Sequence, residues 1–193
     1  MAETTRSFTR GAGAIAGALL AVSAVTPPAA VAAAAAAVAL PQPGSDDRGD
    51  FYSIVAEHSD LAITAQTHGP RPLGMVQAPM GGRTTQQWRV VRWGHAWVLV
   101  NRHSGLCAAI PREPHARLVQ DVCGRYGRVN PRALWHADRP GVLSGRPVMW
   151  RSAFNKECID VFGRSHDHYT IVQHHRCHRD ENQVFRLVPV TGS

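Results

Sequence analysis

The chain has 193 residues, a length that favours one compact domain with a short extension. It carries a formal net charge of +7 and four cysteines. Its basic residues are almost all arginines spread along the chain, with Lys156 the single lysine, so a nucleic-acid partner is not expected. Neither a G-x-S-x-G nor an H-E-x-x-H motif occurs, and we therefore predict no enzyme activity, no catalytic residue and no cofactor.

The first 40 residues have the features of an export signal. Arg6 and Arg10 precede an uncharged apolar stretch over residues 11–26, and small-residue cleavage patterns follow it. The sequence therefore predicts a cleavable signal peptide with an Ala-rich segment over residues 1–40. The mature protein is then expected to be secreted and extracellular.

A membrane anchor over residues 11–40 is the alternative for this segment. Pro27 and Pro28 interrupt it, and alanine is only weakly lipophilic. No stable membrane anchor is therefore expected. Residues 41–50 are polar and predict a short linker before the folded domain.

Past residue 50 the sequence contains three similar segments. The predicted repeats cover about residues 51–91, 96–137 and 148–190. Each ends in an aromatic residue, and these core anchors lie 47 and 50 residues apart at Trp88, Trp135 and Phe185. Repeats of this length indicate a pseudo-symmetric or modular fold.

The composition of the repeats favours strands over helices. Apolar runs such as 97–100 and 170–173 are short and β-branched, and Gly, Pro, Asn and Asp interrupt them every few residues. No stretch shows a sustained 3.6-residue period. Three copies predict an all-β barrel closed by hairpins, in which one aromatic side chain of each repeat enters a shared core.

An even number of cysteines in an exported chain predicts disulfides. The pairs Cys107–Cys123 and Cys158–Cys177 are 16 and 19 residues apart, and each falls inside one repeat. We therefore expect these two bonds among the three possible pairings. A four-cysteine zinc site is disfavoured because the sequence has no C-x-x-C pair.

A family resemblance follows from these motifs. Ser-Gly-Leu-Cys at 104–107, an apolar strand ending in Cys123, and a Q-x-W pattern at the repeat ends resemble the ricin B-type lectins. The resemblance covers roughly residues 51–190. It implies a β-trefoil of three pseudo-symmetric repeats and a carbohydrate-binding function, with each repeat able to hold one shallow sugar site.

The third repeat matches the family's sugar-binding pattern. The resemblance implies that Asp160 and Asn182 bind adjacent sugar hydroxyls, that Gln183 braces Asp160, and that His175 lies under the pyranose ring. Gln173 occupies a more variable contributing position. Carboxylate and amide groups suit vicinal hydroxyls, which both donate and accept hydrogen bonds. The implied ligand is a galactose-type sugar or a polysaccharide.

Departures from the pattern limit the prediction. A Trp or Tyr would stack better than His175, and Tyr169 is a nearby substitute. The second repeat has Ala109 in place of the aspartate. In the first repeat Gln86 remains, but the aspartate that it would hold in place is missing. Both repeats are interpreted as scaffold, so the alternative function is a protein-binding or inhibitory β-trefoil with decayed sugar sites and a separate protein chain as partner.

Five histidines crowd the third repeat, at positions 166, 168, 174, 175 and 178. They make a transition-metal site conceivable. Alternation along a strand, however, sends His174 and His175 to opposite faces, and Cys177 is expected to be oxidised. We therefore predict no metal site.

Overall fold

The computed structural model describes residues 51–113 and 116–191. The expected signal peptide and linker over residues 1–50 lie outside these residues. Within the described part, no helix is long and apolar enough to span a membrane.

The described chain is built from short strands. Those of the first repeat are β1 (Phe51–Ala56), β2 (Ala62–Ala65), β3 (Met75–Ala78) and β4 (Trp88–Trp93). Those of the second are β5 (Ala96–Asn101), β6 (Cys107–Ala109), β7 (Val119–Asp121) and β10 (Trp135–Ala137), with the small hairpin β8 (Gly124–Arg125) and β9 (Arg128–Val129). Those of the third are β11 (Trp150–Ser152), β12 (Cys158–Val161), β13 (Val172–His175) and β14 (Phe185–Pro189).

Single turns of 3₁₀ helix connect some of these strands. They are η1 (Thr84–Gln86), η2 (Pro131–Ala133), η3 (Val142–Ser144), η4 (Phe162–Arg164) and η5 (Glu181–Gln183). Three of them, η1, η2 and η5, stand two residues before the aromatic anchor of their repeat. They therefore occupy equivalent places in the three repeats.

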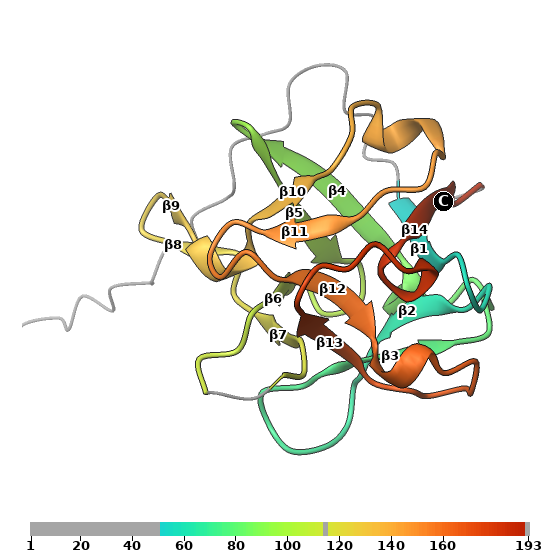
Figure 1. Ribbon diagram of the computed structural model, residues 1–193. Helices are drawn as coiled ribbons and strands as arrows, with labels where there is room; N and C mark the ends of the chain where they lie inside the picture. Colours follow the sequence, from blue (N-terminus) through green and yellow to red (C-terminus); the bar gives the residue numbers. More distant parts are fainter. Residues whose placement is uncertain (1–50, 114–115, 192–193) are drawn as a thin grey trace, which may run out of the picture. The chain divides into compact units, whose positions relative to one another are not determined.

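The first and last strands of the repeats form a barrel (Figure 1). Antiparallel pairing runs from β14 through β1, β4, β5 and β10 to β11. A bridge between Val148 and Phe185 then connects the third repeat's two barrel segments. Closure of this kind removes exposed strand edges.

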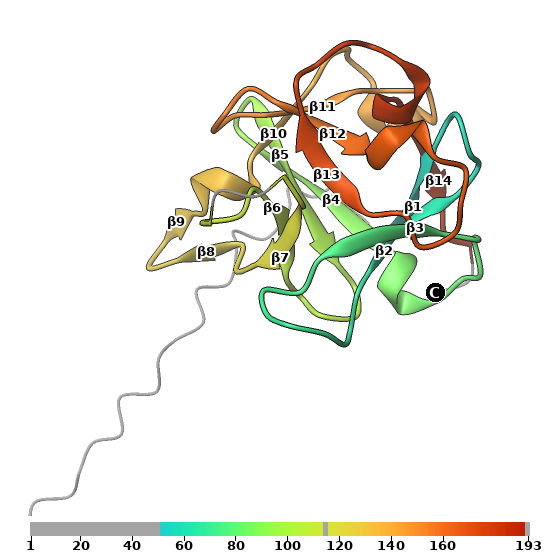
Figure 2. The same ribbon diagram turned by 60° about the horizontal axis from the view of Figure 1, so that its bottom comes forward.

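The middle strands of each repeat form a hairpin, and the three hairpins meet at one end of the barrel (Figure 2). The pairs are β2 with β3, β6 with β7, and β12 with β13. Bridges join neighbouring hairpins at Gly74–Val119, Val76–Ile171 and Arg117–Gln173. A six-stranded barrel capped by three hairpins is a β-trefoil, so the predicted all-β, β-trefoil fold class is confirmed.

The aromatic anchors fill the shared core. Trp88, Trp135 and Phe185 are fully buried in one hydrophobic cluster. The two indole groups donate equivalent hydrogen bonds from Nε1, at 3.0 Å to the carbonyl oxygens of Ile63 and Ala108. The repeats are therefore similar in hydrogen bonding as well as in backbone path.

Two disulfides tie the hairpins of the second and third repeats to the segments that follow them. They join Cys107 with Cys123 and Cys158 with Cys177, the pairs expected from the spacing. Closing loops of this size stabilises a fold by roughly 3 kcal/mol each in the chain-entropy model. The second bond also positions the segment that completes the candidate site.

Candidate functional site

The candidate site begins with Asp160 on β12. Successive residues of a strand point to opposite faces, and Asp160 stands directly across from Gln173 on β13 in the hairpin register. The aspartate is only 2% exposed. A buried carboxylate requires hydrogen-bond donors, because burial of an unpaired charge costs several kcal/mol.

Three side-chain amides supply those donors. Gln173 Nε2 donates to Asp160 Oδ1 at 2.8 Å. Asn182 Nδ2 and Gln183 Nε2, both from η5, donate to Oδ2 at 3.0 and 2.9 Å. The four polar residues predicted from the third repeat therefore form one network, with Asp160 as the shared acceptor.

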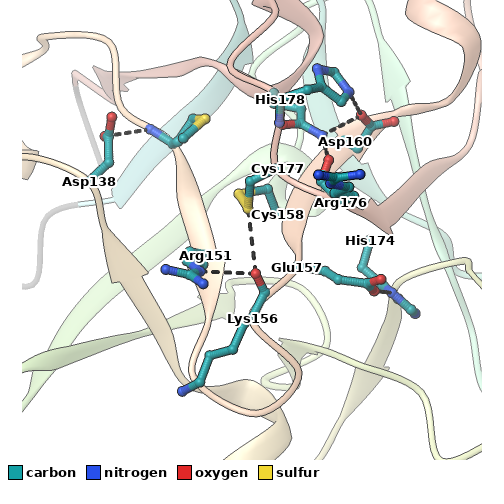
Figure 3. Close-up of a disulfide and its surroundings, with 12 residues drawn as sticks. Asp138, Arg151, Lys156, Glu157, Cys158, Asp160, His174, Arg176, Cys177 and His178 are labelled. Carbon is teal, nitrogen blue, oxygen red and sulfur yellow. Dashed lines mark hydrogen bonds and ion pairs between the residues drawn. A yellow bond between two sulfur atoms is a disulfide. The ribbon is translucent and has the colours of Figure 1, made fainter.

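Gln183 also holds the segment after β13. Its Nε2 donates to the carbonyl of Arg176 at 3.0 Å, and its Oε1 accepts from the backbone amide of His178 at 2.9 Å. Cys177, between these two residues, is tied to Cys158 next to the site (Figure 3). The backbone beside Asp160 is thus fixed by one covalent and two hydrogen-bonded contacts.

A hollow of about 310 Å³ opens beside this network, lined by Asp160, Phe162, Arg164, Gln173, His175, His178 and Asn182, with Gly163. Phe162 begins η4 immediately after β12 and is 55% exposed. An exposed aromatic ring in a hollow with polar groups suits a ligand that has both a hydroxylated and an apolar face.

Phe162 was missed by the sequence analysis, although an apolar aromatic directly after the strand that carries Asp160 was an available signal. His175 and Tyr169, the two side chains that were expected to stack on the sugar ring, lie in different places. His175 lines the hollow and is exposed. Tyr169 is exposed and is absent from its lining, so the idea that it substitutes for His175 is not supported.

One acceptor in the site has no partner within the described residues. Asn182 Oδ1 is buried and accepts no hydrogen bond there, while the same side chain donates to Asp160 and to the Val161 carbonyl. Buried polar atoms are almost always paired in folded proteins. This buried oxygen therefore has an unused acceptor position, on a residue that lines the hollow.

His178 adds a contact that the family pattern did not predict. Its Nε2 lies 3.3 Å from Asp160 Oδ2, and its Nδ1 lies 3.1 Å from Asp180 Oδ2. Its ring stands edge-on to the ring of His175, with 5.7 Å between centroids. His174 turns away and pairs with Glu157.

The equivalent place in the second repeat is apolar. Ala109 replaces the aspartate, and Ala133 replaces the bracing glutamine; both are buried in a cluster around Cys107 and Cys123. Arg132, at the position of Asn182, donates to the Pro111 carbonyl instead. This repeat holds no carboxylate at the position of Asp160.

The first repeat differs from the sequence-based interpretation. Gln86 does have a group to brace: its Nε2 donates to Thr64 Oγ1 at 3.0 Å and to the Pro79 carbonyl at 2.9 Å. Its Oε1 accepts from the Gly81 amide at 2.9 Å. The interpretation was wrong because it considered only a carboxylate as the braced group, whereas a hydroxyl occupies that position.

Comparison with known proteins supports the assignment of the fold. Residues 40–123 match a family model described as ricin-type beta-trefoil lectin domain-like. The match covers the first repeat and the second as far as Cys123, so Asp160 lies outside it. No curated protein matches the sequence.

Several solved structures share the fold. A designed 3-fold symmetric protein, ThreeFoil, is 24% identical with a TM-score of 0.62, covering 72% of this chain and 97% of that one. The ricin B-like lectin of Macrolepiota procera, in complex with lactose, is 20% identical with a TM-score of 0.58, covering 72% and 95%. An exo-beta-1,3-galactanase from Clostridium thermocellum is 23% identical with a TM-score of 0.62, but only 30% of that longer chain is covered.

The described chain is therefore a β-trefoil, a fold that it shares with a designed protein, with a ricin B-like lectin and with part of an exo-beta-1,3-galactanase chain. Over residues 40–123 the chain resembles the family described as ricin-type beta-trefoil lectin domain-like. This match and the fold support carbohydrate binding.

Proposed function

We propose that this chain is a lectin that binds a galactose-type sugar, alone or within a polysaccharide, in the hollow of the third repeat. The observation that carries the proposal is the buried Asp160 carboxylate, held by three amides at the edge of a hollow that also contains an exposed aromatic ring. Asp160 Oδ1 receives one of these three bonds and keeps acceptor capacity. Asn182 Oδ1 is a second acceptor without a partner within the described residues, and although this atom is buried, its residue lines the same hollow.

These groups match the chemistry of a sugar with vicinal hydroxyls. Each hydroxyl can donate to one of the two oxygens, and hydrogen bonds to an ionised carboxylate are stronger than neutral ones. The apolar C–H face of the pyranose can lie on Phe162 or His175. The lactose complex of the Macrolepiota procera lectin and the N-acetylgalactosamine complex of an earthworm R-type lectin, which is 14% identical with a TM-score of 0.54 over 73% of this chain and 99% of that one, favour the galactose class.

A single shallow site of this kind binds weakly, with a dissociation constant on the order of 1 mM, or about −4 kcal/mol. The proposal therefore includes display of several copies on one polysaccharide or surface, which raises avidity without new contacts. It also places the protein outside the cell. In support, all four cysteines are paired in disulfides, which persist in oxidising compartments.

The test is binding of the full chain to a panel of sugars and polysaccharides, by calorimetry or a glycan array. Asp160→Asn removes the carboxylate, and Asp121→Asn is the matched control, since Asp121 stands in the second repeat where His175 stands in the third. Binding that the first variant loses and the second keeps supports the proposal. Phe162→Ala, at an exposed position, provides the same test if Asp160→Asn does not fold.

Absence of binding by the folded wild-type chain would overturn the proposal. It would favour the protein-binding or inhibitory β-trefoil, for which the loss of the carboxylate in the second repeat, where the buried Ala109 replaces it, is the supporting observation. Catalysis is not part of the proposed function. We therefore expect that a sugar incubated with the chain is recovered unchanged.

A further inference from the structure

Three potential metal ligands meet at the edge of the hollow. Asp160, His175 and His178 each offer one ligand atom, and these atoms lie within 4.8 Å of one another. Within the described residues this is the one group of histidine, cysteine and acidic side chains that meets this condition. We propose that these three side chains bind a transition-metal cation of the Zn²⁺ class.

The distances suit such an ion. Ligands about 2.0–2.1 Å from a tetrahedral ion lie roughly 3.3–3.4 Å apart. Asp160 Oδ2 and His178 Nε2 already lie 3.3 Å apart. His175 is exposed, so its side chain can rotate toward the ion, and its ring already lies next to that of His178.

The surroundings of His178 match those of a metal-bound histidine. Such histidines usually donate their second ring N–H to a carboxylate, which orients the ring and raises its basicity. His178 Nδ1 lies 3.1 Å from Asp180 Oδ2 and also accepts a hydrogen bond from the Asp180 backbone amide at 3.3 Å. Binding of a metal ion at Nε2 requires the ring proton on Nδ1, where the Asp180 carboxylate can accept it.

The same carboxylate is itself held in place. Asp180 forms an ion pair with Arg164, which also offsets the charge of an arginine that lines the hollow. Two imidazoles and one carboxylate favour Zn²⁺, Cu²⁺ or Ni²⁺ over Ca²⁺ and Mg²⁺, which prefer oxygen ligands. Three protein ligands leave a fourth position for water or a sugar hydroxyl.

This inference departs from the sequence-based expectation of no metal site. Alternation along β13 does separate His174, which pairs with Glu157, from His175. His178, however, lies beyond the strand, on the segment fixed by the Cys158–Cys177 disulfide. That segment returns to Asp160 and brings the second imidazole next to the first.

The experiment uses the full chain purified without a histidine tag and stripped with a chelator. Zn²⁺ is titrated by calorimetry, and Co²⁺ is added as a probe whose visible absorption reports tetrahedral nitrogen and oxygen ligands. We expect one ion per chain. Asp180→Asn should weaken Zn²⁺ binding by about tenfold or more, because it removes the orienting carboxylate.

Removal of a direct ligand is expected to have a larger effect. His175→Ala and His178→Ala should each abolish the tetrahedral Co²⁺ spectrum, whereas the control His95→Ala, an exposed histidine in the turn between β4 and β5, should leave it unchanged. Unchanged Zn²⁺ affinity in both ligand variants, or no binding by the wild type, would overturn the proposal. The metal site shares Asp160 with the proposed sugar site, but the titration contains no sugar, so the two proposals can fail separately.

Discussion

Gln86 donates a hydrogen bond to the hydroxyl of Thr64 at 3.0 Å, in the first repeat, in the same way that Gln183 donates to the Asp160 carboxylate at 2.9 Å in the third. Both glutamines also donate to a backbone carbonyl and accept from a backbone amide of the segment after the hairpin. The bracing glutamine is therefore a structural element of two repeats. Only in the third repeat does it hold a carboxylate.

The two glutamines allow a matched test of structural and binding roles. Gln86→Ala and Gln183→Ala should each lower the free energy of unfolding by about 1–3 kcal/mol, because each leaves buried polar groups without a partner. Only Gln183→Ala should also weaken sugar binding, since Asp160 loses a donor. Chemical denaturation and glycan binding measure the two effects. Equal loss of binding in both variants would place the sugar site elsewhere.

Introducing a carboxylate into the first and second repeats tests whether the bracing glutamine stabilises a buried charge. Thr64→Asp should change the free energy of unfolding by no more than about 1 kcal/mol, because the amide of Gln86 is in place to bond it. Ala109→Asp should destabilise by at least about 3 kcal/mol or prevent folding, because Ala133 offers no donor and the charge stays buried and unpaired. Thermal and urea unfolding compare the two. An equal change in the free energy of unfolding in the two variants would show that the glutamine does not stabilise the carboxylate.

Phe162 is expected to provide most of the apolar contact with the sugar ring. Phe162→Ala should weaken binding by about tenfold, equivalent to roughly 1.4 kcal/mol, while leaving stability nearly unchanged because the ring is exposed. Tyr126→Ala, at the 90% exposed tip of the β8–β9 hairpin, is the control. A larger effect of His175→Ala than of Phe162→Ala would instead assign the stacking role to the histidine that the family pattern indicates.

The two disulfides should stabilise the fold by similar amounts, but only one of them should affect sugar binding. Replacing both cysteines by alanine in either bond should cost about 3 kcal/mol, given the 16- and 19-residue separations. Loss of the Cys158–Cys177 bond should also weaken sugar binding, because it frees the segment that carries His178. Loss of the Cys107–Cys123 bond should not. The comparison is made by calorimetric unfolding and by binding under conditions where both variants are folded.

The residue pattern was sufficient to predict the architecture. Three aromatic anchors at nearly constant spacing, short β-branched runs and frequent turn residues led to an all-β barrel, and the cysteine spacing led to the two pairs found. These features can be predicted from the sequence because each depends on a local requirement: strand alternation, turn geometry or a short disulfide loop. The aromatic anchors recur in all three repeats and the cysteine pairs in two, and this repetition strengthens both signals.

The candidate site was predictable only in part. Asp160, Gln173, Asn182 and Gln183 were identified because a family pattern places them at set spacings, and they do form one network. Phe162 and His178 were not identified, because their roles depend on how η4 and the segment after β13 return to the same hollow. The Gln86–Thr64 bond was missed for a similar reason, since a hydroxyl in place of a carboxylate resembles loss of the site when only residue types are compared.

The sequence by itself determined the number of repeats, the all-β character and the disulfide pairs, which follow from residue type and spacing along one strand or one hairpin. Its resemblance to a known family then indicated the repeat that holds a carboxylate. Tertiary structure alone decided which side chains line the same hollow and that Asn182 Oδ1 has no hydrogen-bond partner within the described residues. It also decided that two histidines from different segments lie next to one carboxylate. The physical reason is that these relationships depend on the packing of segments distant in space and on side-chain direction, neither of which is encoded by local periodicity.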